Sequence, residues 1–148
     1  MRTFGEEIEL TVDSGAAKTL CPQSVAANVP TSPGKKFKEG VHDTCAGGKR
    51  IPNWGEKRCL MSTEERGRLH GLTLQAAEVN RPLLSVSRCV DGGNRIAFDQ
   101  ESSYIEDKLT GERTTLQRKG GLYTMKSWVR AKTDEDIASG FPRQGGAK

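Results

Sequence analysis

Apolar and polar residues alternate near the start of the chain, and this pattern predicts a β-strand with one buried face. Segment 8–12 has Ile, Leu and Val at every second position, with Glu and Thr between them. The tripeptide Asp-Ser-Gly follows at 13–15, and all three residue types favour turns for local reasons. We therefore expect Asp13 to leave the end of a buried strand in a tight loop. Taken alone, the tripeptide is more often a simple turn than a catalytic site.

Similar patterns predict the later elements. We expect further strands at 72–76, 94–98, 104–105, 114–116 and 122–129. Residues 85–91 predict a short helix that ends at Gly92-Gly93, because glycine readily adopts the left-handed cap conformation. Turn signals in 41–60 predict one or two hairpins. Residues 62–68 carry a possible capping box but no apolar stripe, so we expect an exposed loop there.

Composition agrees with a β-rich domain. The chain has 148 residues, of which 34% are hydrophobic and 17 are glycine. That is enough for one domain with a modest core, and the number of glycines favours a loop-rich β fold over a helical bundle. From Arg130 onward the sequence offers little to bury, and we expect residues 130–148 to be a disordered tail.

No apolar run approaches the length of a membrane span, and the first residues do not resemble a signal peptide. We expect a soluble, cytoplasmic protein without a membrane contact. The four cysteines form no Cys-x-x-Cys pair, so free thiols are expected, with no metal and no cofactor. Segment 42–45 together with Cys59 could supply zinc ligands, but their spacing is unusually wide.

Positive charge is concentrated in two parts of the chain, whose net charge is +4. Residues 31–70 carry nine Lys or Arg against five Asp or Glu, and residues 112–148 carry eight against four. Such segments could contact RNA through its phosphates, a salt-sensitive attraction, although a solvated surface explains them more simply. Aromatic residues are few, and we expect at most a weak RNA contact.

Two segments and their order resemble one protein family. Segment 8–20, Ile-Glu-Leu-Thr-Val-Asp-Ser-Gly-Ala-Ala-Lys-Thr-Leu, resembles the catalytic strand and loop of retropepsin-type aspartic proteases. Segment 82–98, which begins Pro-Leu-Leu-Ser-Val, resembles that family's later short helix and final strand. With Gly-Leu-Tyr at 121–123, the chain is most similar to the protease and the following pre-integrase segment of copia-type LTR retrotransposon polyproteins. The resemblance covers about residues 5–129.

The resemblance implies a mainly β fold: a retropepsin-like closed β-barrel, equivalent to half of an acid protease, with one short helix and a C-terminal β-hairpin extension. Residues 1–99 would form the protease domain and residues 100–129 a β-rich extension. It also implies an aspartic endopeptidase that binds an extended peptide and processes a polyprotein. Because the chain has one such loop, the active enzyme would be a homodimer with one Asp13 from each copy.

The family also assigns roles to neighbouring residues. Asp13 would be catalytic. The residues that would support its loop are Ser14, Gly15, Ala16 and Thr19, with Gly15 and Ala16 lining the substrate channel. Residues expected to pack beneath the loop are Leu83, Leu84 and Ser85, although the family generally has glycine in place of Ser85.

A flap should cover the substrate, and such a flap needs a mobile tip that contains glycine. The candidate flap residues are Gly47, Gly48, Trp54 and Gly55. We expect Trp54 and Gly55 at the tip, with burial of Trp54 against the sheet as the alternative.

A noncatalytic hypothesis stays open beside the enzyme. The twelve residues before Asp13 are fewer than retropepsins usually have, and that first segment normally contributes to the dimer interface. The chain would then be a retropepsin-like scaffold, or a nucleic-acid-binding relic of a retrotransposon, that does not cleave peptides.

Overall fold

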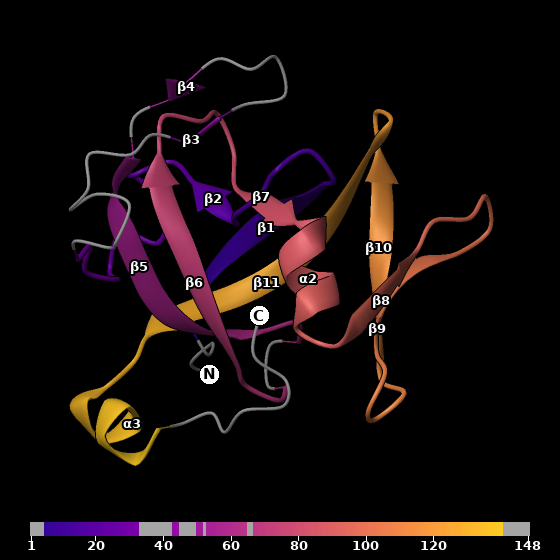
Figure 1. Cartoon of the computed structure of the whole chain (residues 1–148). Helices are drawn as coiled ribbons and strands as arrows, with labels where there is room; N and C mark the ends of the chain where they lie inside the picture. The colour runs from indigo at the N-terminus through magenta and orange to yellow at the C-terminus, as the bar shows by residue number, and fades with distance from the viewer. Residues whose placement is uncertain (1–4, 33–42, 45–49, 52, 65–66, 141–148) are drawn as a thin grey trace.

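The computed structural model describes residues 5–32, 43–44, 50–51, 53–64 and 67–140. The described part is mainly β, as expected, with two short helices (Figure 1). The strands in chain order are β1 (Glu6–Asp13), β2 (Leu20–Cys21), β3 (Asp43–Thr44), β4 (Arg50–Ile51), β5 (Asn53–Ser62), β6 (His70–Ala77), β7 (Leu83–Ser85), β8 (Asn94–Ala97), β9 (Ser103–Asp107), β10 (Arg113–Lys119) and β11 (Leu122–Ala131). The helices are α2 (Val86–Asp91) and α3 (Asp134–Ser139).

Nine strands form one sheet in the order β1-β7-β2-β6-β5-β11-β10-β9-β8, and β1 also pairs with β11. Strand pairing therefore leads from β1 through β7, β2, β6, β5 and β11 and back to β1. Most neighbours are antiparallel, but β1 runs parallel to β7, and β2 runs parallel to β6. These two parallel pairs lie next to the loop that follows β1, so they position the candidate site.

Strand β11 is integrated into the sheet and is not an appendage to it. Along its length it pairs antiparallel with β1, from Glu6↔Val129 to Thr11↔Thr124. It pairs with β5 at its end and with β10 at its start. The segment expected as an extension therefore completes the sheet around β1. The expected boundary at residue 99 does not separate two hydrophobic cores, because one cluster contains both Leu10 and Met125.

The main core follows from the alternation of apolar residues in these strands. Its fully buried members include Leu10, Leu74 and Leu84, and residues from β9, β10 and β11 join them. Helix α2 adds Cys89 to the same cluster. The core thus draws on almost the whole described chain, from Ile8 to Val129.

Helix α2 forms where the sequence predicted it. Ser85 is its N-cap, and its side chain accepts a hydrogen bond from the backbone N–H of Arg88. Gly92 is the C-cap with φ −80°, and the left-handed conformation falls one residue later, at Gly93 with φ +90°.

Helix α3 corrects two expectations, namely a single helix and a disordered tail from residue 130. Thr133 and Asp136 form a reciprocal capping box, and Gly140 ends the helix with φ +71°. Arg130 Nη1 lies 3.3 Å from Asp136 Oδ2, which ties the helix to the end of β11. No residue of α3 is buried, so polar contacts in its first turn hold it. Residues 141–148 lie outside the described residues.

The other local predictions agree with the described strands. β9 and β10 form the expected hairpin, with Ile105 opposite Thr114. β3 and β4 pair antiparallel within the 41–60 segment. The described residues of the 62–68 loop include the exposed Glu64 and Arg68, while Ser62 is fully buried. Among the described helices, none is long and apolar enough to cross a membrane.

Candidate active site

Asp13 is the last residue of β1, as the sequence predicted. Its Oδ1 accepts a hydrogen bond of 2.8 Å from the backbone N–H of Gly15, and its own carbonyl lies 3.4 Å from the backbone nitrogen of Ala16. Both contacts close a tight turn directly after the strand. One carboxylate oxygen is thereby fixed by the loop, and the carboxylate is partly accessible to solvent.

Strand β7 lies between β1 and β2, the two strands that the Asp13 loop connects. Asp13 stands opposite Ser85 in the parallel β1–β7 pair, and Leu20 of β2 stands opposite Leu83. The backbone N–H of Thr11 also donates to the carbonyl of Pro82 at 3.0 Å. A segment some seventy residues later in the chain is thus held between the two ends of the loop.

Ser85 bonds the loop directly. Its Oγ donates to the carbonyl of Ala16 at 2.6 Å, and its backbone N–H donates to Oγ1 of Thr19 at 3.1 Å. Ser85 is fully buried, so these bonds are shielded from water. The carbonyl of Thr19 in turn accepts from the N–H of Gln75 in β6 at 2.8 Å. The loop therefore has anchors on both β7 and β6.

The other loop residues divide by exposure. Ser14 and Gly15 are exposed, whereas Ala16 and Thr19 are buried. Ala16 was expected to line a substrate channel, but its side chain is only 6% exposed and its carbonyl anchors the loop. Gly15 is not among the described glycines with positive φ, so a left-handed backbone is not the reason for glycine there.

Leu83 and Leu84 lie on opposite faces of β7. Leu84 is 1% exposed and belongs to the main core. Leu83 packs in a separate small cluster with Leu20, Ala77 and Val79. All three residues predicted to pack beneath the loop, Leu83 to Ser85, are thus next to the strands that carry it.

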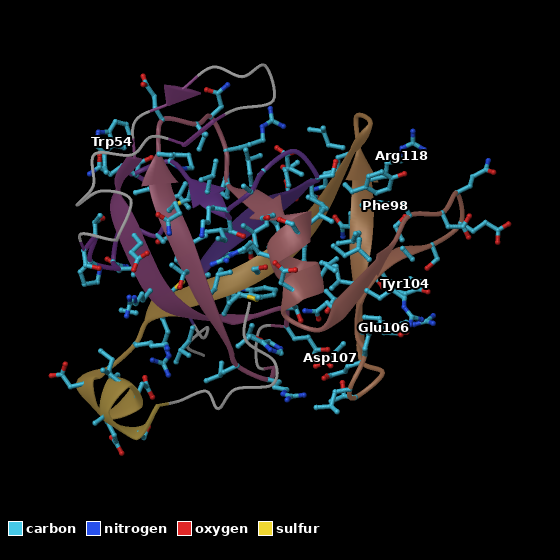
Figure 2. The ribbon with its side chains drawn as sticks, in the orientation of Figure 1. Trp54, Phe98, Tyr104, Glu106, Asp107 and Arg118 are labelled. Atoms are coloured by element: carbon cyan, nitrogen blue, oxygen red, sulfur yellow. The ribbon has the colours of Figure 1, made fainter. Side chains whose placement is uncertain are left out.

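We expected Trp54 and Gly55 at the tip of a flap, and this prediction is wrong. Both residues lie in strand β5, where Gly55 pairs with Ala76. Gly55 has φ +123°, and a Cβ there would lie 2.5 Å from the carbonyl oxygen of Ser32. Close backbone approach therefore explains this glycine. Trp54 is 38% exposed, and Figure 2 shows it on the opposite side of the view from Phe98 and Arg118.

The other two flap candidates, Gly47 and Gly48, lie outside the described residues. The segment that contains them joins β3 to β4, which pair as the two arms of a hairpin. In Figure 1 these arms and the loop after β1 lie toward the same end of the molecule, at the top of the view.

Lys57 is a structural residue that the sequence analysis missed. It is 2% exposed, and its Nζ donates to the carbonyls of Gln23, Val25 and Ala26 at 2.8–3.1 Å. Glu6 accepts from the N–H of Ala26 at 3.0 Å. Together they hold the turn after β2, in which Ala26 has φ +54°. The sequence does contain a signal for its burial. Lys57, Cys59 and Met61 occupy alternate positions of β5 and therefore point to the same face of the sheet.

Three cysteines are described, and all are buried and outside any disulfide: Cys21, Cys59 and Cys89. Burial raises the pKa of Cys21 to about 11, although the positive charge of Lys57 acts in the opposite direction. Burial likewise raises the pKa of Cys59 to about 12. The thiols of Cys21 and Cys59 are therefore poor nucleophiles near neutral pH. The described residues contain no group of three or more His, Cys, Asp or Glu able to hold a metal ion.

Two pockets lined by described residues do not include Asp13 in their lining. The first encloses about 80 Å³ over a floor that includes Leu84 and Met125. Its rim carries Arg68 and Glu112, whose charged groups lie 3.6 Å apart. This pocket has an apolar floor and charges of both signs, and its lining includes Asp107, the last residue of β9, whose Oδ1 accepts a hydrogen bond of 2.9 Å from the backbone N–H of Leu109. A carboxylate held in a turn at a strand end is therefore not unique to Asp13. Asp13 is the candidate because it belongs to the Asp-Ser-Gly loop on which the family resemblance depends, and the cavity is a separate feature.

Comparisons with protein-family models, with curated proteins and with solved structures found no match for this chain. Any assignment of function therefore depends on the geometry around Asp13.

Proposed function

We propose that the chain is a retropepsin-like aspartic endopeptidase that acts as a homodimer on a polyprotein. The observation that carries this proposal is the fixed carboxylate of Asp13 at a strand end, with β7 held between the two strands of its loop. A buried hydroxyl, that of Ser85, bonds the loop from below. The circuit of pairings from β1 back to β1 is compatible with a closed barrel of the retropepsin type.

Two Asp13 carboxylates would form the catalytic pair. Close like charges share one proton, because ionising both at short distance is costly. The ionised carboxylate takes a proton from water while the water oxygen attacks the peptide carbonyl carbon. The protonated one donates a hydrogen bond to the carbonyl oxygen. The C–N bond then breaks as the amine leaving group receives a proton, and water has been added across the peptide bond.

The requirement for a dimer follows from the chain itself. Asp13-Ser14-Gly15 is the one Asp-Ser-Gly of the sequence. Asp43 has no glycine two residues later, and Asp91 ends helix α2. A single copy therefore offers one carboxylate in an Asp-Ser-Gly loop, and the matching one would come from another copy.

The test is peptide cleavage by Asp13→Asn. With oxidised insulin B chain as the probe at mildly acidic pH, we expect cleavage that a statine-type inhibitor blocks. Asp13→Asn should lower the rate on the order of 10³-fold, the scale of a lost general base. Asp91→Asn is the matched control, since Asp91 is exposed and lies outside the loop, and it should retain full activity. Undiminished cleavage by Asp13→Asn would reject the proposal.

A second candidate is a noncatalytic scaffold of the same architecture, which binds peptide or RNA without turnover. For RNA, two of the exposed arginines, Arg95 and Arg113, already make ion pairs with Glu106. Filter binding of a single-stranded RNA at rising salt tests this candidate, which predicts steep loss of binding and no peptide cleavage.

A further inference from the structure

The cavity that is separate from the Asp13 loop reaches down to the main core. It encloses about 80 Å³. Its floor is formed by buried side chains of that core, namely Met61, Leu84, Cys89, Ile105 and Met125. An apolar cavity of about 150 Å³ holds benzene, so this smaller floor suits an aliphatic group of about four carbons.

The β8–β9 pair places two polar side chains beside this floor. Ile96 stands opposite Ile105, and two residues along the ladder Asn94 stands opposite Asp107. Alternate residues of a strand point to the same face, so Asn94 and Asp107 share the inner face with the two isoleucines. The Cβ atoms of directly opposite residues are about 5 Å apart. Both polar side chains line the cavity, and Figure 2 shows Asp107 at the lower end of β9.

The amide of Asn94 provides an acceptor on the cavity wall. Asn94 is 5% exposed, and its Nδ2 donates to the carbonyl of Cys89 at 2.9 Å. That bond fixes which end of the amide is the donor, so Oδ1 is the acceptor. Among the described residues, none donates a hydrogen bond to this oxygen. A buried acceptor without a donor is costly, and the oxygen therefore favours a ligand or a water that can donate to it.

Asp107 places a negative charge beside that acceptor. Its Oδ1 accepts from the backbone N–H of Leu109 at 2.9 Å, which fixes the carboxylate at the end of β9. A carboxylate has about four acceptor positions, so it can accept from a ligand as well as from its own turn. Together with Asn94 Oδ1 it forms two adjacent oxygen acceptors, one of them charged. An ammonium group has three donors and no acceptor, and it matches this pair.

The arginines of the lining do not favour an anion in place of the ammonium. Arg68 lies 3.6 Å from Glu112 at the rim. Arg113 donates to Glu106 at 2.7 Å, and Glu106 points to the opposite face of β9 from Asp107. Both arginine charges are thus already matched by carboxylates. The remaining charged or ionisable groups of the lining are Glu64 and His70.

We propose that this cavity binds a primary ammonium ion that carries a short branched aliphatic group. The aliphatic group lies over Leu84 and Met125, and the ammonium donates to Asn94 Oδ1 and to the carboxylate of Asp107. A free alkylamine and the N-terminal residue of a peptide both have this chemistry. The site does not involve Asp13, so the inference is independent of the proposed protease.

Titrations of the full chain, followed by two-dimensional NMR of its backbone amides, test the site. Isobutylamine should bind saturably and shift the amide signals of β8 and β9. Isobutanol keeps the shape without the charge, and isovalerate has a carboxylate in place of the ammonium. Both should bind at least about tenfold more weakly, the scale of a lost hydrogen bond to a charged group. L-Valinamide presents the ammonium as a peptide N-terminus does, so its affinity relative to isobutylamine distinguishes the two sources.

Asp107→Asn keeps an acceptor for the N–H of Leu109 but removes the charge. It should weaken the binding of isobutylamine at least about tenfold and leave that of isobutanol unchanged. Asp99→Asn is the matched control, because Asp99 is exposed, lies outside the lining and likewise accepts from a backbone N–H, that of Gln100 at 2.7 Å. It should bind isobutylamine like the parent chain.

A second variant fills the cavity instead of changing its charge. Thr114 lines the cavity from β10, where it stands opposite Ile105. Thr114→Leu adds apolar volume there and should abolish saturable binding, and far-UV circular dichroism checks that the variant is folded. Binding that survives in folded Thr114→Leu, or that is undiminished in Asp107→Asn, would overturn the site. Isobutylamine that binds no more tightly than isobutanol or isovalerate, or that shows no saturation, would also overturn it, since the cavity would then hold water only.

Discussion

At the scale of single residues, Ser85 connects the Asp13 loop to a distant part of the chain. Its Oγ donates to the Ala16 carbonyl and accepts from the Arg88 N–H, so one hydroxyl both anchors the loop and caps α2. Ser85→Ala leaves a buried carbonyl without its partner and removes the cap. We expect the free energy of unfolding to fall by about 2–3 kcal/mol.

Urea unfolding followed by circular dichroism measures this loss. Ser102→Ala is the matched control, since Ser102 is an exposed serine and should change stability by less than about 0.5 kcal/mol. Equal stability of the two variants would contradict the role assigned to Ser85.

A second prediction at this scale concerns Lys57. Its ammonium group donates to three backbone carbonyls in a buried position. Lys57→Met keeps most of the side-chain volume but removes this donor from the carbonyls of Gln23 and Val25, whereas the carbonyl of Ala26 still accepts from the backbone N–H of Val29 at 2.9 Å. Unsatisfied buried groups cost about 1–3 kcal/mol each, so a total loss of at least about 2 kcal/mol is expected in urea unfolding. The control is Lys108→Met at an exposed position, and a loss no larger than that of the control would refute the assignment.

At the scale of elements, α3 depends on the ionised carboxylate of Asp136. Hydrogen bonds from the backbone and side chain of Thr133, with a contribution from Arg130, lower the pKa of that carboxyl below its ordinary value. A folded-state pKa below the unfolded one adds stability above the unfolded pKa, which is lost as pH falls through the folded pKa. We therefore expect α3 to lose order at acidic pH, below the ordinary Asp pKa of about 4.

Two-dimensional NMR of the full chain follows this transition. The Asp136 side-chain carbon should titrate below the other exposed aspartates, and Thr133→Ala should move its midpoint up toward theirs. Ser139→Ala, at the last residue of the helix, should leave the midpoint unchanged. Because the backbone N–H of Thr133 stays in this variant, the upward shift should be partial, and an unshifted midpoint would contradict a contribution of the Thr133 side chain.

Elements that have strong local signals were predictable from the sequence. The alternation of apolar and polar residues predicted β1 and β6, and Gly92-Gly93 predicted the end of α2, because these signals act within a few residues. Helix α3 was missed because it has no apolar stripe, although its capping box is readable from Thr133 to Asp136. The Trp54-Gly55 tip was wrong because the same glycine signal also marks a close backbone approach inside a strand.

Strand partners could not be predicted in this way. Alternation reports which face of a strand is buried, but it does not report which strand lies beside it. Residues 122–129 were correctly expected to be apolar and extended, but their place between β1 and β5 depends on contacts more than sixty residues apart. For the site, the turn at Asp13 was predictable, whereas the anchoring of that turn by Ser85 Oγ required the fold.

At the scale of the whole molecule, the position of β11 makes the two ends of the described chain interdependent. A chain that ends at Asp99 loses the partner of β1 along Glu6–Thr11 and the core side chains Met125 and Val129. Leu10 and Ile8 would then face water on an open sheet edge. We expect residues 1–99 alone to fail to fold, although the resemblance to retropepsins suggested them as a domain.

Thermal unfolding and NMR amide dispersion compare three chains: the full chain, residues 1–140 and residues 1–99. The chain that ends at Gly140 keeps every described strand and helix, so it should unfold cooperatively and resemble the full chain. The chain that ends at Asp99 should lack both a cooperative transition and dispersed amide signals. A folded 1–99 chain would mean that β1 is stable without β11.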